Sequence, residues 1–359
     1  MKKKIAFVLN NFQIADGVAQ ALLEICNHLD KSKYDITIIP LYKIEKNMKE
    51  RLANKDVKVK KVFGFYFRGF SRLLKLIPIK LFYKVLLGKK YDIEVGFQFG
   101  LPTEIVGNST NKKAKHIIWI HGYDYELKHK SIYEKADKVA CVSKENAKRL
   151  YDDLKGNVNV QYCYNIVDEK KVREKAERER SGVKTHPYFV TVGRLSEEKG
   201  YLRLLQVCKN LVESNYLFHL DIVGGGAEFE TLQKYIDNNK LGDFVDLLGR
   251  QENPHKYTIN ADAYVCSSFS EGYSVACVEA VLLGVPVIST QVSGANEIIE
   301  DSNSGIVVEN SNEGIEKGMK MVLENEQLTK EWKEKIKSNV YKFEKKYRCE
   351  QLDEFFSKI

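Results

Sequence analysis

The sequence lacks the features that mark secreted, zinc-bound and membrane-spanning proteins. Its seven cysteines are scattered, odd in number and without close spacing, which argues against a disulfide framework and against a zinc site. The apolar run that follows the first lysines, Ile5 to Leu9, is too short for a signal peptide. No run approaches the roughly 20 apolar residues of a membrane span. These absences predict a cytoplasmic protein, either soluble or attached to the inner face of the plasma membrane.

Several catalytic motifs are also missing. The chain has no Asp-x-Asp, no His-x-x-x-His and no cluster of His and Cys residues, so we expect neither a metal nor another cofactor. Gly-x-Ser-x-Gly is absent as well, which leaves a serine hydrolase without support.

Acidic residues are missing from one segment, residues 58–90, in a chain of net charge +8. Its basic residues alternate with aromatic and aliphatic ones, and they are Lys58, Lys60, Lys61, Arg68, Arg72, Lys75, Lys80, Lys84, Lys89 and Lys90. This composition suits an anionic membrane surface, a nucleic acid, or a helix that packs on its own core and exposes a basic face.

The length and the order of predicted elements indicate two α/β domains. A single core stops growing near roughly 250–300 residues, and this chain has 359. Strands and helices alternate in two series, each typical of a parallel, doubly wound sheet. We predict a first domain over 1–168, a polar linker over 169–185 and a second domain over 186–343. Apolar residues at helical spacing predict that the last segment, 344–359, packs on the first domain.

The stretch from Glu271 to Glu279 indicates a ligand site. A short apolar strand over 263–266 precedes it, and a helix is predicted over 275–283. Glu271 then lies in a strand-to-helix loop, at the edge of a parallel sheet where ligands bind. Gly272 lets a ligand approach the backbone, and the helix start offers free N–H groups to an anion.

Two further strand-to-helix loops carry anion-binding features. Gly193 and Arg194 follow one predicted strand, and Lys199 comes five residues after Arg194. A guanidinium and an ammonium group together suit a diphosphate. Gly224 opens a run of three glycines that is typical either of a phosphate-binding turn or of a plain tight turn.

Two residues of the first half complete the candidates. Gly17 precedes the first long predicted helix, where backbone N–H groups can meet an anion. His121 follows the predicted strand over 116–120, a position suited to a site, although a single histidine is more often a structural hydrogen bonder.

Together these residues resemble the family 4 glycosyltransferases, of the type that builds bacterial capsule and exopolysaccharide. The resemblance covers nearly the whole chain, and two departures stand out: Asp16 and Ser274 occupy positions where the family often has glycine. The residues that carry it are Gly17, His121-Gly122, Asn165, Gly193-Arg194, Lys199, Gly224-Gly225-Gly226, Glu271 to Glu279, and Gly284 to Ile288. It implies a GT-B fold, in which two Rossmann-like, doubly wound domains face each other across a cleft.

The resemblance also implies roles for these residues. Arg194 and Lys199 would hold the nucleotide diphosphate, and Glu279 would accept hydrogen bonds from the ribose. Glu271 and His121 would line the donor-sugar site. The backbone N–H groups of Gly272, Tyr273, Ser274 and Val275 would bind the donor, with Gly17, Gly193 and Gly224 as further donor-binding positions.

The implied function is that of a retaining, metal-independent glycosyltransferase. It would move a hexose or N-acetylhexosamine from a UDP-sugar to a glycan acceptor. Two alternatives stay open: a nucleotide-sugar epimerase of the same fold, which needs no acceptor, and a basic module that binds polyanions. The latter leaves Glu271 and Glu279 unexplained, so we do not expect a nucleic acid partner.

The basic segment 58–90 suggests where the acceptor lies. An acceptor linked to polyprenyl diphosphate would suit a domain whose surface carries Lys, Arg, Phe and Leu, because anionic lipid attracts each nearby cation by about 1 kcal/mol. We therefore expect a peripheral membrane enzyme that extends a lipid-linked glycan. The alternative is that the apolar residues of this segment only face the sheet.

Overall fold

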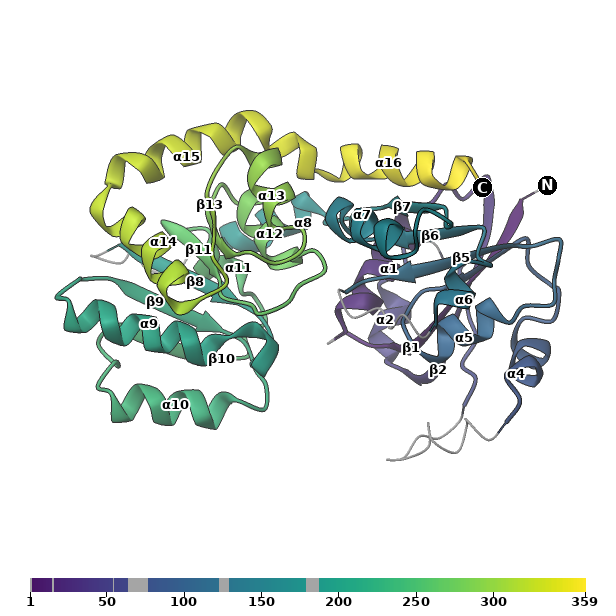
Figure 1. The fold of residues 1–359 in the computed structure, drawn as a ribbon, viewed down its shortest axis with the longest axis horizontal. Helices are drawn as coiled ribbons and strands as arrows, with labels where there is room; N and C mark the ends of the chain where they lie inside the picture. The colour runs from purple at the N-terminus through teal and green to yellow at the C-terminus, as the bar shows by residue number, and fades with distance from the viewer. Residues whose placement is uncertain (1, 15, 54, 64–76, 123–128, 179–186) are drawn as a thin grey trace. The chain divides into compact units, whose positions relative to one another are not determined.

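The computed structural model describes the chain except residues 1, 15, 54, 64–76, 123–128 and 179–186 (Figure 1). The chain forms two compact units, residues 1–166 with 348–359 and residues 167–347. Each unit has its own parallel sheet and its own apolar core. Of the predicted linker, Glu169–Arg178 is helical, and this helix, α8, belongs to the second unit.

The first unit is built on a parallel sheet of seven strands in the order β3-β2-β1-β4-β5-β6-β7, counted over the described residues. The strands are β1 (Lys3–Phe12), β2 (Tyr34–Ile44), β3 (Lys58–Val59), β4 (Ile93–Gly96), β5 (Lys115–Ile120), β6 (Lys138–Cys141) and β7 (Val160–Tyr162). Ile5 to Leu9 of β1 are fully buried. A central strand of a parallel sheet is covered on both faces, which explains why this run is continuously apolar.

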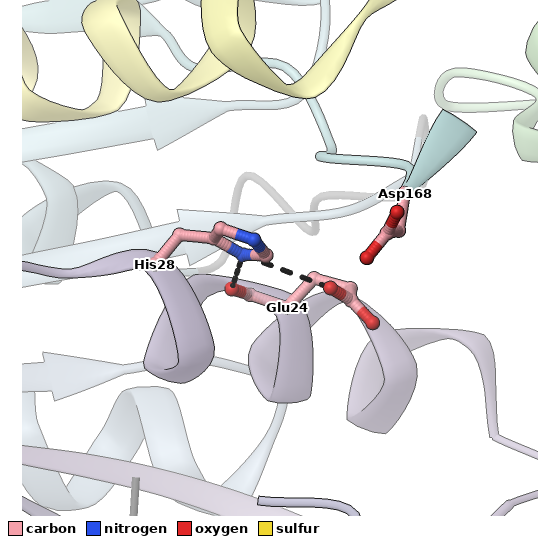
Figure 2. Close-up of side chains that lie close together, drawn as sticks. All are labelled: Glu24, His28 and Asp168. Atoms are coloured by element: carbon pink, nitrogen blue, oxygen red, sulfur yellow. Dashed lines mark hydrogen bonds and ion pairs between the residues drawn. The ribbon is translucent and has the colours of Figure 1, made fainter. Parts of the chain in front are cut away.

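Helices connect the strands of the first unit. They are α1 (Gly17–His28), α2 (Lys46–Glu50), α4 (Ile79–Leu86), α5 (Leu101–Gly107), α6 (Lys130–Tyr133) and α7 (Lys144–Asp153). Near the end of α1, His28 Nδ1 lies 2.7 Å from the carbonyl oxygen of Glu24 and 3.7 Å from its carboxylate (Figure 2). His28 thus contacts both the backbone and the side chain of the residue one turn before it in α1.

The last helix, α16 (Lys345–Ser357), brings the C-terminal residues into the first unit. Phe356 is fully buried, and its ring packs edge-on against those of Phe7 and Tyr34. Lys138 donates a hydrogen bond of 2.9 Å to the carbonyl oxygen of Phe355. The apolar side of α16 therefore completes the core of the first unit.

The second unit has a parallel sheet of six strands in the order β10-β9-β8-β11-β12-β13, again counted over the described residues. Its strands are β8 (Tyr188–Val192), β9 (His219–Val223), β10 (Val245–Gly249), β11 (Ala263–Cys266), β12 (Val287–Thr290) and β13 (Ile306–Val308). Its helices besides α8 are η2 (Glu197–Lys199), α9 (Tyr201–Glu213), α10 (Phe229–Asn238), α11 (His255–Thr258), α12 (Val275–Leu282), α13 (Ala295–Ser302), α14 (Asn312–Glu324), α15 (Glu326–Asn339) and η3 (Val340–Phe343). Because β8 lies between β9 and β11, the loops that follow these three strands emerge side by side.

The basic segment is described only in part. Arg68, Arg72 and Lys75 lie outside the described residues, while α4 begins directly after Pro78. Within the described residues, no helix is long and apolar enough to cross a membrane.

Candidate active site

The candidate residues of the second unit follow the carboxyl ends of adjacent strands. Gly193 and Arg194 come after β8, Gly224 comes after β9, and the loop 267–274 comes after β11. The strand order thus brings together residues that are far apart in sequence. This edge is where parallel α/β sheets bind their ligands.

Lys199 and Glu271 form an ion pair, with Nζ and Oε1 2.6 Å apart. The hydroxyl of Ser268 donates a second hydrogen bond, of 2.7 Å, to the same carboxylate oxygen. Only 25% of the Lys199 side chain and 11% of the Glu271 side chain are exposed. Burial lowers the pKa of Lys199, but the charge and hydrogen bond of Glu271 outweigh burial, so the net pKa is raised. Lys199 is therefore a fixed cation with donors to spare.

The start of α12 faces the same edge. Ser274 is its N-cap and accepts a hydrogen bond of 3.4 Å from the N–H of Cys277. Tyr273 is buried, whereas Val275 is partly exposed. Gly272 is buried beside Tyr273. The first N–H groups of a helix have no partner within it, so this end can receive an anion.

Glu279 lies at the start of the second turn of α12, in surroundings that disfavour its charge. Burial raises its pKa to about 7, although the positive charge of Lys175 opposes the shift. His255 of α11 lies close, with Nδ1 4.0 Å from Oε2 of Glu279. Burial lowers the pKa of His255 to about 4, so its ring is neutral near pH 7. No sequence signal marks His255, because a histidine after a loop proline is unremarkable.

The glycines after β8 and β9 allow two loops to pack backbone against backbone. A Cβ on Gly224 would overlap the carbonyl oxygen of Gly193, and one on Gly226 would overlap that of Leu195. The N–H of Gly224 donates 2.9 Å to the carbonyl of Gly249, and the N–H of Gly193 donates 3.0 Å to that of Val223. Both amides are thus used inside the protein, and loop packing accounts for Gly224 and Gly226.

Arg194 and Arg203 extend this edge in different ways. Arg194, at the end of β8, is exposed. Arg203 of α9, which the sequence analysis overlooked, is buried and donates hydrogen bonds to the carbonyls of Ser267 and Ser268. Its position three residues after Gly200 gave no sign that it reaches a loop more than 60 residues away.

The first unit holds the two remaining candidates, Gly17 and His121. Gly17 begins α1, but the carboxylate of Asp16 accepts hydrogen bonds from the N–H groups of Val18 (3.0 Å) and Ala19 (3.4 Å). Asp16 thus already caps the amides that an anion would use. A Cβ on Gly17 would meet nothing within 4 Å, so packing does not require a glycine there.

His121 directly follows β5, and its ring packs on Phe97 with centroids 4.5 Å apart. Burial lowers its pKa to about 3, against an opposing hydrogen bond to the backbone of Phe97. Its Nε2 is buried and has no hydrogen-bond partner within the described part of the chain. The ring is therefore neutral near pH 7.

One other cluster of potential ligand atoms in the second unit lies elsewhere on the sheet. Nε2 of His219 lies 2.9 Å from Oδ1 of Asp221 and 3.1 Å from Oδ2 of Asp246. His219 is the first residue of β9, so the cluster is at the amino end of the strands. It is separate from the edge that carries Glu271.

Comparison with known proteins shows the fold and a family to which part of the chain is similar. Residues 172–339 match the family model "Glycosyl transferases group 1". The chain is 30% identical over 219 residues to the Campylobacter jejuni N-acetylgalactosamine-N,N'-diacetylbacillosaminyl-diphospho-undecaprenol 4-alpha-N-acetylgalactosaminyltransferase, covering 60% of this chain and 58% of that protein. An uncharacterized glycosyltransferase of Haemophilus influenzae is 24% identical over 343 residues, covering 91% and 92% of the two chains.

Among solved structures, Anabaena HepE in complex with UDP superposes with a TM-score of 0.78 at 16% identity, covering 99% of this chain and 100% of that one. This likeness shows the fold, and it confirms the prediction of a GT-B protein with two Rossmann-like units. Residues 172–339, which include Lys199, Glu271 and Glu279, are thus similar to the group 1 family of glycosyl transferases.

Proposed function

We propose that this protein is a retaining glycosyltransferase that moves a sugar from a nucleotide sugar to a glycan acceptor. The observation that carries the proposal is the largely buried ion pair of Lys199 and Glu271 at the sheet edge. The ammonium group suits a diphosphate, the carboxylate suits sugar hydroxyls, and α12 begins in the same loop. Glu279, further along α12, would take the ribose.

In the proposed reaction, the side chains of Lys199 and Arg194 take the place of a metal ion. The bond from the anomeric carbon to the diphosphate oxygen breaks, and the acceptor hydroxyl oxygen bonds to that carbon on the same face. The electron pair leaves with the diphosphate, so negative charge grows beside Lys199 and Arg194. Fixed cations placed where charge develops lower the barrier. The acceptor proton passes to a departing phosphate oxygen.

Relatives support a UDP-sugar donor and a lipid-linked acceptor. HepE was crystallised with UDP, and also with UDP-glucose. The name of the Campylobacter jejuni relative describes transfer of N-acetylgalactosamine to a saccharide on undecaprenyl diphosphate. We propose that this chain likewise takes a UDP-hexose or UDP-N-acetylhexosamine. The roles of Gly17 and His121 in donor binding rest on family resemblance.

A donor screen tests the activity. The protein is incubated with a panel of UDP- and GDP-sugars, with and without lipid-linked acceptors, and the release of nucleoside diphosphate is measured. We expect release from a UDP-sugar that depends on the acceptor. Turnover of a nucleotide sugar alone into its epimer would instead establish an epimerase, and tighter calorimetric binding of GDP than of UDP would overturn the donor assignment.

Helix α4 supports a place at the membrane for this enzyme. Leu81 and Val85 expose 51% and 68% of their surface, one turn apart, while Phe82 is buried against the core of the first unit. Lys80 and Lys84 are exposed beside them. An exposed apolar strip with flanking lysines suits the interface of an anionic bilayer. We propose that α4 attaches the protein there as a peripheral membrane enzyme.

Liposome flotation tests the attachment. We expect binding to vesicles with an anionic lipid, weaker binding in high salt, and loss of binding when Lys80 and Lys84 are changed to Glu. The matched control changes Lys234 and Lys317, exposed lysines of the second unit, to Glu. Equal binding by both variants, or activity on a free sugar acceptor without vesicle binding, would dispose of this role for α4.

A further inference from the structure

Arg203 holds the loop that carries Glu271. Its Nε donates to the carbonyl oxygen of Ser267 at 2.8 Å, and its Nη2 donates to those of Ser267 and Ser268 at 2.5 and 2.7 Å. Its Nη1 donates to Oδ1 of Asn310 at 2.7 Å. The residue is only 5% exposed. A planar guanidinium with donors in a fixed fork therefore sets the positions of two successive carbonyl groups.

The surroundings of Arg203 reinforce this hold. The ring of Phe269 stacks on the guanidinium, with its centroid 3.8 Å from Cζ. Asn310, which accepts from Arg203, also donates 3.2 Å to the carbonyl of Phe269. The hydrogen bonds of this buried cation thus go to backbone carbonyls and an amide. A buried charge is costly unless hydrogen bonds satisfy it, so the loop must keep the conformation that supplies them.

The two residues that Arg203 holds are the same two that fix the ion pair. Ser268 accepts from Arg203 through its carbonyl and donates from its hydroxyl to Glu271 at 2.7 Å. Ser267 accepts from Arg203 through its carbonyl and donates from its hydroxyl to the carbonyl of Lys199 at 3.0 Å. A single serine therefore connects the guanidinium of Arg203 to each member of the pair: Ser267 connects it to Lys199, and Ser268 connects it to Glu271.

We propose that Arg203 is a positioning residue of the active site, which fixes the loop 267–271 and thereby places Glu271 against Lys199. Its kinetic consequence rests on the proposed glycosyltransferase function, whereas its effect on the loop does not. Arg203 touches neither partner of the pair, so it acts through Ser267 and Ser268. A lysine in its place offers one point charge and cannot hold both carbonyls in the same geometry.

Hydrogen exchange measured by mass spectrometry tests the effect on the loop without any substrate. In Arg203→Met we expect amides of segment 267–271 to exchange at least tenfold faster, with an intermediate increase in Arg203→Lys. The matched control is Arg348→Met, which removes another buried arginine, stacked on Tyr164 in the first unit. Exchange of the loop at the wild-type rate in Arg203→Met would overturn the proposal. If Arg203→Met does not fold, the same comparison with Arg203→Lys decides.

Kinetics separate positioning from general stability. A misplaced catalytic group can cost about 10²-fold in rate, so we expect Arg203→Lys to lower kcat at least tenfold. UDP should still bind at full stoichiometry and with affinity within threefold, because Glu279 lies outside the loop. If the fraction of protein that binds UDP fell by the same factor as kcat, part of the protein would be misfolded, and the role of Arg203 would be merely structural. Wild-type protein inactive on every donor would refute the proposed function, while the exchange experiment would still decide on Arg203.

Discussion

At the scale of single residues, the pair of Lys199 and Glu271 explains how one site can hold both a cation and a carboxylate with little solvent. Each neutralises the charge of the other, which offsets the cost of burial. An ammonium group has three donors and spends one on Glu271, so others remain for a phosphate. Under the proposed function, the pair would thus be in place before a donor arrives.

Removing the ammonium group should slow the proposed reaction strongly. We expect Lys199→Ala to lower turnover by roughly 10²–10³-fold, the typical effect of losing one donor to a developing charge. Steady-state kinetics with the UDP-sugar found in the screen measures this. Lys209→Ala, which removes an exposed lysine of α9, is the control. Near-normal turnover in Lys199→Ala would contradict its place at the diphosphate.

If Glu279 binds the ribose as proposed, nucleotide binding should depend on pH. Its pKa is raised to about 7 by burial, so at pH 6 only about a tenth of it is ionised. Because ribose hydroxyls donate to the carboxylate, we expect UDP to bind roughly tenfold more weakly at pH 6 than at pH 8. His255 stays neutral over this range, since its pKa is lowered to about 4. Calorimetry at both pH values measures the change, and Glu279→Gln should reduce it.

The same shift affects stability in a defined direction. Below pH 4.5, the ordinary pKa of the group, the carboxyl is protonated whether the protein is folded or unfolded. Between about 4.5 and 7 the unfolded chain loses this proton while the folded protein keeps it, so stability falls as pH rises. Wild-type protein that loses no more stability than Glu279→Gln over this range would argue against the raised pKa.

At the scale of elements, the turns after β8 and β9 show why a glycine run need not be a phosphate loop. The carbonyls of Gly193 and Leu195 occupy the space that side chains on Gly224 and Gly226 would need. The two loops can therefore approach closely, which sets the edge of the sheet beside Arg194.

A methyl group at this contact should separate the loops. We expect Gly224→Ala to destabilise the second unit by about 1–3 kcal/mol, the usual cost of overpacking. Gly242→Ala is the control, because a Cβ there meets nothing within 4 Å. Chemical denaturation of both variants provides the measurement. Equal stability would mean that the loops relax without cost.

At the scale of the whole molecule, the chain leaves the first unit at residue 166 and returns to it at residue 348. The returning helix α16 buries Phe355 and Phe356. Folding of the first unit therefore needs the two ends of the sequence. The second unit is continuous, residues 167–347.

Loss of one aromatic ring from α16 should weaken the first unit. We expect Phe356→Ala to cost about 3–5 kcal/mol, the typical range for a buried phenylalanine. Tyr347→Ala, at a partly exposed site of the same helix, should cost about 0.5 kcal/mol or less. Thermal unfolding measures the loss of stability, and hydrogen exchange shows which of the two units is destabilised. A change confined to residues 167–347 would contradict the packing of α16.

The sequence by itself determined the class of fold and the sheet edge on which the candidate residues lie. Apolar runs such as Ile5 to Leu9 give the strands, and helical spacing gives the elements between them, because both patterns are local. The strand-to-helix loop of Glu271, with a helix holding Glu279, follows from the same local signals. These signals were enough to suggest the GT-B fold and its family.

Only the tertiary structure decided which side chains meet. Lys199 reaches Glu271 across 72 positions of sequence, and Arg203 clamps the loop of Glu271 across 64. Both contacts exist because β8 pairs with β11, which is not its neighbour in the chain. Strand order depends on how whole elements pack, and the periodicity of residues within one element does not predict that order. The same packing buries Glu279 and His121, which raises the pKa of Glu279 and lowers the pKa of His121.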